Sequence, residues 1–204
     1  VRSLCYCSDL HAHAGQQLHG TAAKAIWLKT CNIFGGEENL LPSAVLKLVN
    51  ESKNGLESLK VPAGLSRAKA NAIVDLASHF EEGKLSDKIL LDPTIPDNEL
   101  KSKLLAVKGI GEWTYTMFAI FELHKPDILA VGDLGVRRGI AKIFCIQGSG
   151  TKGSLHEKKD RDRMMSITAP FAPYRSLFTW YMWRDMDLST PLDGNDAACN
   201  NNVL

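Results

Sequence analysis

The feature that most constrains the fold of this chain is a pair of glycines set between two helix-forming segments. Apolar residues at helical spacing run up to Lys108-Gly109-Ile110-Gly111, and an almost wholly apolar segment extends from Glu112 to Leu123. Glycine permits a tight backbone turn because its Cα carries only hydrogen. The pattern therefore predicts a hairpin that joins two helices. The amide groups at the start of the second helix could face an anion such as a phosphate.

A second feature is a single acidic residue in a turn-like segment after the hairpin. Asp133 follows Val131-Gly132 and directly precedes residues 134–144, which have helical periodicity. Asp is a favoured N-cap because its carboxylate accepts hydrogen bonds from the first backbone N–H groups of a helix. Taken alone, the position of Asp133 favours a helix cap.

Together these segments resemble the helix–hairpin–helix plus Gly/Pro-Asp motif of the DNA glycosylase superfamily. More narrowly, they resemble its alkyladenine branch, the 3-methyladenine DNA glycosylase II family. The hairpin match spans residues 104–114 and the acid match spans residues 126–139. Weaker matches flank these two, at residues 16–23, 63–70 and 171–176, and at Trp183. Many DNA-binding proteins carry such a hairpin, so the specificity of the resemblance lies in the combination of hairpin, acid and the Pro-Tyr-Arg-Ser sequence at residues 173–176.

The resemblance and the periodicity predict an all-α fold with two helical lobes, a helix–hairpin–helix motif and a DNA-binding cleft between the lobes. Helical patterns support this at residues 22–31, 44–49, 67–80, 96–107, 112–123, 134–144 and 163–186. Ser66 stands where the N-cap of the third helix is expected. Strand patterns are weak. Residues 146–159 are polar and rich in Gly and Ser, which predicts a solvated surface loop.

A glycosylase domain is expected over residues 1–186, followed by a polar, Asn-rich tail at residues 187–204 that we expect to be disordered. In comparison with the family, the chain lacks the opening helix, so we expect the domain to be truncated at its N-terminus. Residues 7–15 interrupt a helix that the family would make continuous, and they form a candidate insertion.

The resemblance places the catalytic aspartate of the family at Asp133. Hydrolysis of an N-glycosidic bond builds positive charge on the deoxyribose, and a nearby carboxylate can stabilise that charge and orient or deprotonate a water molecule. With the hairpin at the distance that the family shows, we favour the catalytic role over the helix cap.

Trp113 stands where the strand-nicking branches of the superfamily carry a lysine, and an indole cannot form a Schiff base with the sugar. The resemblance therefore implies a monofunctional enzyme that removes the base and leaves an abasic site. It also implies that Trp113 and Trp183 line the substrate pocket, where an aromatic face would attract a positively charged alkylated purine. The alternative is that both residues are core aromatics.

Five further residues match positions that contact DNA in the family. Gln17 would fill the gap left by a flipped base, and His19 would probe the neighbouring bases. The alternative for both is a polar residue at the start of a surface helix. At the hairpin, the matching residues are Lys108, Gly109 and Gly111, which would meet phosphate groups.

Arg175 and Ser176 match a motif that supports the acid and the pocket in the family. Arg175 could instead pair with a core carboxylate. Arg137 and Arg138 could meet phosphates, or could simply be solvated bases.

The resemblance implies no cofactor and no metal at the active site. The iron–sulfur pattern of some glycosylases needs four cysteines near the C-terminus, where this chain has only Cys199. Cys5-x-Cys7 and His11-x-His13 are superficially like zinc ligands, but they lack the usual separation between two ligand pairs. Binding of a cation by backbone groups of the hairpin stays an open alternative.

Composition adds little about partners. The 204 residues include 24 basic and 23 acidic ones, a net charge of +1, so a DNA-binding protein of this charge must rely on local bases and backbone amides. No apolar run approaches the length of a membrane span. The expected partner is double-stranded DNA with damaged bases, bound by a monomer. The expected location is intracellular, and the nucleus if the source is a eukaryote.

The sequence thus predicts a monofunctional DNA glycosylase that hydrolyses the N-glycosidic bond of alkylated purines of the 3-methyladenine type, by base flipping and Asp-assisted hydrolysis in base excision repair. The alternative is a non-catalytic protein on the same scaffold that binds DNA lesions or abasic sites. The intact Asp133 and Trp113 favour the enzyme, whereas the truncation and the candidate insertion favour an inactive copy.

Overall fold

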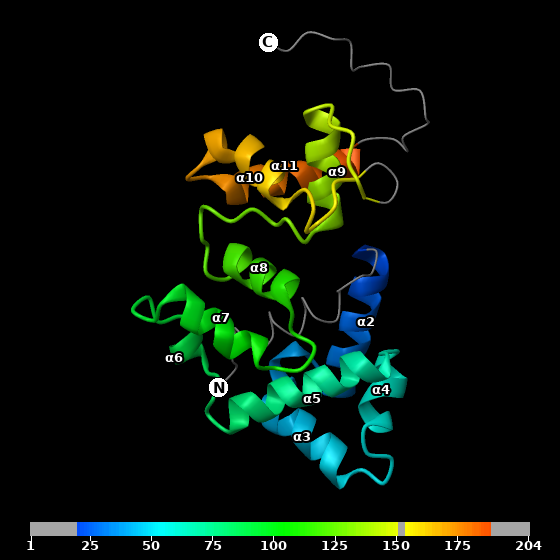
Figure 1. Cartoon of the computed structure of the whole chain (residues 1–204). Helices are drawn as coiled ribbons and strands as arrows, with labels where there is room; N and C mark the ends of the chain where they lie inside the picture. Colours follow the sequence, from blue (N-terminus) through cyan, green and yellow to red (C-terminus); the bar gives the residue numbers. More distant parts are fainter. Residues whose placement is uncertain (1–19, 151–153, 189–204) are drawn as a thin grey trace. The chain divides into compact units, whose positions relative to one another are not determined.

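Every regular element in the described part of the chain, residues 20–150 and 154–188, is a helix in the computed structural model (Figure 1). The predicted all-α class is therefore confirmed. The chain divides into two units, one ending at Leu123 and one beginning at His124, which agrees with the prediction of two helical lobes.

The described residues of the first unit, 20–123, form seven α-helices and one 3₁₀ turn. These are α2 (Gly20–Ile33), η1 (Glu37–Asn39), α3 (Pro42–Glu51), α4 (Glu57–Ala63), α5 (Arg67–Glu81), α6 (Asp87–Leu90), α7 (Asp97–Leu105) and α8 (Glu112–Phe121). α3 lies against α5, and α2 lies against α4 (Figure 1). The buried core of this unit includes Leu40, Val45, Leu59, Ile73, Leu76 and Leu104.

The helix α5 illustrates how closely the local sequence determines the first unit. Ser66 has an extended backbone, and its Oγ accepts a hydrogen bond from the backbone N–H of Lys69 at 3.3 Å. This is the N-cap that the sequence predicted. The helical period predicts five inward positions. Four of them, Ala70, Ile73, Leu76 and Ala77, are buried, and the fifth, Val74, is half-buried.

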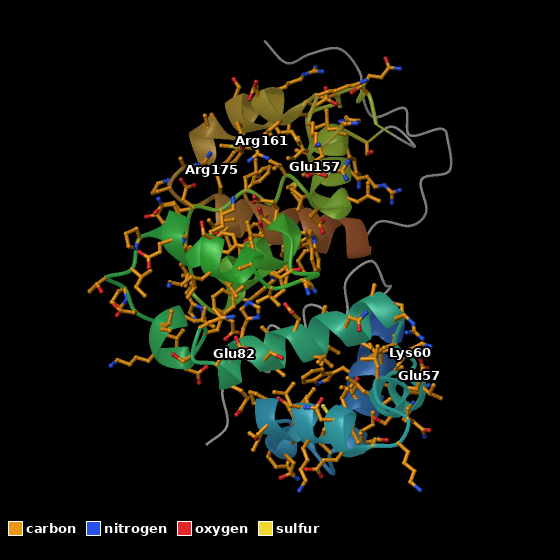
Figure 2. The ribbon with its side chains drawn as sticks, turned by 60° about the horizontal axis from the view of Figure 1, so that its bottom comes forward. Glu57, Lys60, Glu82, Glu157, Arg161 and Arg175 are labelled. Atoms are coloured by element: carbon orange, nitrogen blue, oxygen red, sulfur yellow. The ribbon has the colours of Figure 1, made fainter. Side chains whose placement is uncertain are left out.

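Charged side chains hold the short helix α4 to its neighbours. Glu57 and Lys60 lie next to one another one turn apart, with Nζ and Oε2 separated by 2.9 Å (Figure 2). Oε1 of the same Glu57 accepts a hydrogen bond from Arg67 at the start of α5. Neither α4 nor α6 was predicted, because both are too short to show a helical period.

The second unit contains α9 (Leu134–Ile143), α10 (Arg161–Ile167), the 3₁₀ turn η3 (Ala169–Phe171) and α11 (Arg175–Leu188). α9 and α11 pack against one another (Figure 1). The two helices approach one another closely at Gly139, where an added Cβ would lie 2.9 Å from Cβ of Met182. Only glycine allows this approach of the two helices.

Two predictions of burial were confirmed only in part. The segment 146–159 was expected to be a solvated loop, and Lys158 and Lys159 are exposed, but Ser154 and Leu155 are fully buried. The carbonyl oxygen of Leu155 accepts a hydrogen bond from Nη1 of Arg137 at 2.8 Å, so this part of the loop packs onto α9. The nearly all-apolar segment 112–123 predicts a central buried helix. Tyr115, Met117 and Phe118 of α8 are buried, but Phe121 is exposed.

Candidate functional site

Asp133 occupies the N-cap of α9, as the local sequence alone suggested. Its backbone is extended, and its Oδ1 accepts a hydrogen bond from the backbone N–H of Val136 at 3.0 Å. The side chain is half-buried. A carboxylate at a helix N-terminus is stabilised by the helix dipole and by the unpaired N–H groups of the first turn. The cap and a catalytic role do not exclude each other, because the cap fixes the position of the carboxyl group.

A second hydrogen bond ties the same oxygen to α11. Nε1 of Trp183 donates to Oδ1 of Asp133 at 2.9 Å. The two candidate residues from the second unit, which are far apart in the sequence, are therefore in direct contact. The indole of Trp183 presents its polar edge to the acid.

Gly135 makes room for this contact. An added Cβ on Gly135 would lie 3.1 Å from Oδ1 of Asp133 and 3.2 Å from Cδ1 of Trp183. Both distances are tighter than ordinary van der Waals contact. A side chain at position 135 would therefore press on the acid and the indole together.

One face of α11 holds the extended segment that leads to the acid. Oγ of Ser176 donates to the carbonyl oxygen of Lys125 and accepts from the backbone N–H of Ile128 at 3.0 Å. One turn later, Oγ1 of Thr179 donates to the carbonyl oxygen of Ile128 at 3.2 Å and accepts from the backbone N–H of Ala130 at 3.3 Å. Trp183, one further turn along, binds the acid itself. These contacts fix a segment that has no regular secondary structure.

Arg175 begins the same series of contacts with an ion pair. Its Nε and Nη2 donate to Oδ1 and Oδ2 of Asp127, each at 2.6 Å. Such a bidentate pair fixes orientation as well as distance. The hydrogen bonds from the guanidinium hold the pKa of Asp127 below its ordinary value, and the same contact raises the pKa of Arg175. Arg175 is thus paired with a carboxylate, which was one of the two alternatives that the sequence offered. This carboxylate lies in the segment that precedes Asp133.

The glycine hairpin is formed in the first unit. Gly109 has a φ of +88°, a conformation that favours glycine, and Gly111 has an extended backbone at the N-cap of α8. Gly109 and the side chain of Lys108 are exposed. A Cβ added at Gly111 would meet no atom of the described residues within 4 Å, apart from its neighbours in the chain. The hairpin thus joins α7 to α8 and offers an open, cationic turn.

Trp113 is half-buried in the first turn of α8. It belongs to the first unit, and Asp133 and Trp183 belong to the second. Directly after it, the hydroxyl of Thr114 is buried without a hydrogen-bond partner.

Several sequence-predicted residues fall outside the described residues. They include Gln17 and His19 and the candidate zinc ligands Cys5, Cys7, His11 and His13. Within the described part of the chain, no group of three or more Cys, His, Asp or Glu residues could hold a metal ion. No helix in that part is both long and apolar enough to cross a membrane.

Four residues that shape the hairpin and the surroundings of Asp133 were not predicted: Asp75, Asp127, Gly135 and Thr179. Asp75 contacts the hairpin, because its Oδ2 accepts a hydrogen bond from the backbone N–H of Lys108 at 2.8 Å. Asp127 stands inside the acid match, next to Pro126, and could have been paired with Arg175. Thr179 could have been found by following the face of the last helix from Ser176 to Trp183. Nothing in the sequence near Asp75 indicates its contact with the hairpin.

The family model of the HhH-GPD superfamily of base excision DNA repair proteins matches residues 10–161. The chain belongs to this superfamily. The DNA-3-methyladenine glycosylase of Saccharomyces cerevisiae is 29% identical over 188 residues, which cover 83% of this chain and 62% of that protein. The DNA-3-methyladenine glycosylase 1 of Schizosaccharomyces pombe is 27% identical over 180 residues, which cover 88% of this chain and 72% of that protein. The resemblance to the alkyladenine branch is confirmed. The chain spans less than two thirds of the length of its Saccharomyces relative.

Two solved structures of similar proteins confirm the fold. The 3-methyladenine DNA glycosylase of Schizosaccharomyces pombe in complex with abasic DNA has a TM-score of 0.73 at 24% identity, covering 91% of this chain and 82% of that chain. A DNA-3-methyladenine glycosidase from Bacillus halodurans has a TM-score of 0.67 at 28% identity, covering 90% of this chain and 76% of that chain.

Proposed function

We propose that this chain is a DNA glycosylase that removes alkylated purines of the 3-methyladenine type from double-stranded DNA in base excision repair. The observation that carries the proposal is the half-buried carboxylate of Asp133, fixed by the N-terminus of α9 and by Trp183. By resemblance, Asp133 takes the position of the catalytic aspartate of the superfamily to which the chain belongs. The names of the yeast relatives support the substrate class.

The proposed reaction breaks the bond between C1′ of the deoxyribose and the base nitrogen. The bonding electrons leave with the base, and an alkylated purine that was cationic departs neutral. Positive charge develops on the sugar, and the carboxylate of Asp133 stabilises it at close range. Water then adds at C1′ and loses a proton. A carboxylate already bound by two N–H groups needs little rearrangement during this step.

In the proposed complex, the hairpin binds phosphate groups of the duplex and the target base leaves the stack. The cleft between the lobes, the wedge at Gln17, the probe at His19 and the monomeric state belong to this proposal as expectations. The abasic DNA bound in the Schizosaccharomyces structure supports DNA as the partner.

We further propose that the enzyme is monofunctional. Trp113 stands where a nucleophilic lysine would be needed for a Schiff base, and its indole carries no amine to attack the sugar. The aromatic face would instead bind the cationic base by stacking and cation–π attraction.

The test is incubation of the purified chain with a duplex that contains 3-methyladenine. The proposal predicts release of free 3-methyladenine and sites that are cleaved only after alkali treatment. Borohydride should trap no covalent complex between protein and DNA. Binding without base release would favour the non-catalytic alternative, and a trapped complex would contradict the monofunctional assignment.

A further inference from the structure

The hairpin is held by an acidic residue from a different helix. Oδ2 of Asp75, on α5, accepts a hydrogen bond from the backbone N–H of Lys108 at 2.8 Å. Its other oxygen, Oδ1, lies 3.9 Å from Nζ of Lys108. The side chain of Asp75 is 22% exposed, whereas that of Lys108 is 85% exposed. The contact therefore reaches from the body of the first unit to the surface turn.

This position is electrostatically unfavourable for a protein that binds phosphate at the same turn. A carboxylate repels the DNA backbone, whereas basic side chains raise the non-specific affinity of a protein for DNA. The titratable groups near Asp75 also include His79, whose Nδ1 lies 3.6 Å from Oδ2 of Asp75 and 2.8 Å from its carbonyl oxygen. The charges of Glu82 and Lys84 interact with Asp75 as well. A role for Asp75 in attracting DNA is thus ruled out by the sign of its charge.

The geometry points to a different role, and we propose that Asp75 is a positioning residue that sets the hairpin for phosphate binding. The inference rests on the proposed function. The N–H bound by Asp75 belongs to Lys108, the residue before Gly109, whose positive φ makes the turn. By fixing the peptide between Val107 and Lys108, Asp75 restricts the conformations of the turn before DNA arrives. A turn ordered in advance loses less entropy on binding.

Charge and positioning predict opposite results for the same variant. If charge alone mattered, Asp75→Ala would bind duplex DNA more tightly, because an acid near the phosphates would be gone. If Asp75 positions the hairpin, Asp75→Ala should bind about tenfold more weakly. The slope of log affinity against log salt concentration should also be less steep for Asp75→Ala, by roughly the amount that one phosphate contact contributes. Asp75→Asn should keep most of the affinity, since its amide oxygen can still accept from Lys108.

The experiment measures the affinity of the full chain for an undamaged duplex by fluorescence anisotropy at several salt concentrations. The variants are Asp75→Ala and Asp75→Asn, with Val45→Ala as a control for general destabilisation because Val45 is fully buried in the same unit. All are compared well below their melting temperatures. Affinity of Asp75→Ala equal to or above wild type would overturn the proposal, as would an equal loss in Val45→Ala.

Amide hydrogen exchange tests the same contact without DNA. The exchange rate of the Lys108 amide should rise in Asp75→Ala and stay near the wild-type value in Val45→Ala. An unchanged rate would overturn the proposal. If the wild-type chain does not bind DNA at all, the proposed function fails, while the exchange result still decides whether Asp75 holds the turn.

Discussion

At the scale of single residues, Trp183 forms a specific hydrogen bond that the predicted role in lining the pocket does not include. Its indole N–H donates to Oδ1 of Asp133, so the ring fixes the carboxylate on which the proposed reaction depends. A hydrogen bond to a charged acceptor stabilises by roughly 1.5–3 kcal/mol. The bond also restricts the rotation of the carboxyl group.

Trp183→Phe removes this donor and keeps an aromatic ring. We expect the single-turnover rate of base release to fall by about tenfold or more, while the affinity for damaged DNA changes little. Trp180→Phe is the matched control, because Trp180 is exposed on the same helix. Equal rates for Trp183→Phe and wild type would mean that the indole N–H has no role in the reaction.

Gly135 gives a second prediction at this scale. Gly135→Ala places a methyl group 3.1 Å from the acid and 3.2 Å from the indole, so one or both must shift. For Gly135→Ala, the rate of base release should fall although the melting temperature falls only slightly. A small loss of stability leaves the protein folded and so does not account for the lower rate. Gly139→Ala is the comparison, because its methyl group would press on Met182 and not on Asp133. It should lower the melting temperature, by an overpacking cost of about 1–3 kcal/mol. A larger loss of rate in Gly139→Ala than in Gly135→Ala would contradict this account.

At the scale of elements, the sequence predicted most helices but not what holds them together. Ser66 and the inward residues of α5 follow from capping and periodicity, which are local properties. The glycine hairpin follows from the conformational freedom of Gly109. The pairing of Arg175 with Asp127 joins residues that are distant in the sequence. Such contacts depend on how the segments pack, so a single sequence does not reveal them.

The ion pair between Arg175 and Asp127 predicts a dependence of stability on pH. The guanidinium holds the pKa of Asp127 below its ordinary value of 3.8 in the folded protein. The pair therefore stabilises the fold above about pH 4, and this contribution is lost as the pH falls through the lowered pKa. Asp127→Asn should melt at a lower temperature than wild type at neutral pH. Melting curves over a pH series should show that this difference narrows in acid; a constant difference would mean that the ion pair does not contribute.

At the scale of the whole molecule, composition indicated neither the fold nor a partner. A net charge of +1 gives no sign of DNA binding. The all-α class and the two units were predictable because motifs spread along the chain match one superfamily. The burial of Ser154 and Leu155 was not, since a polar Gly/Ser-rich segment has no pattern that indicates packing.

The central claim is that Asp133 performs the chemistry and is not only a helix cap. Asp133→Asn separates the two roles, because the amide oxygen can still accept from Val136 and Trp183 while the negative charge is lost. A loss of charge at a catalytic carboxylate typically raises the barrier by several kcal/mol, on the order of 10³-fold in rate.

The decisive measurement is the single-turnover rate of 3-methyladenine release by wild type and Asp133→Asn, with melting temperature and DNA affinity determined on the same samples. The account predicts a loss of about 10³-fold in release, with melting temperature and affinity close to wild type. Release at the wild-type rate by Asp133→Asn would contradict it and leave Asp133 as a helix cap.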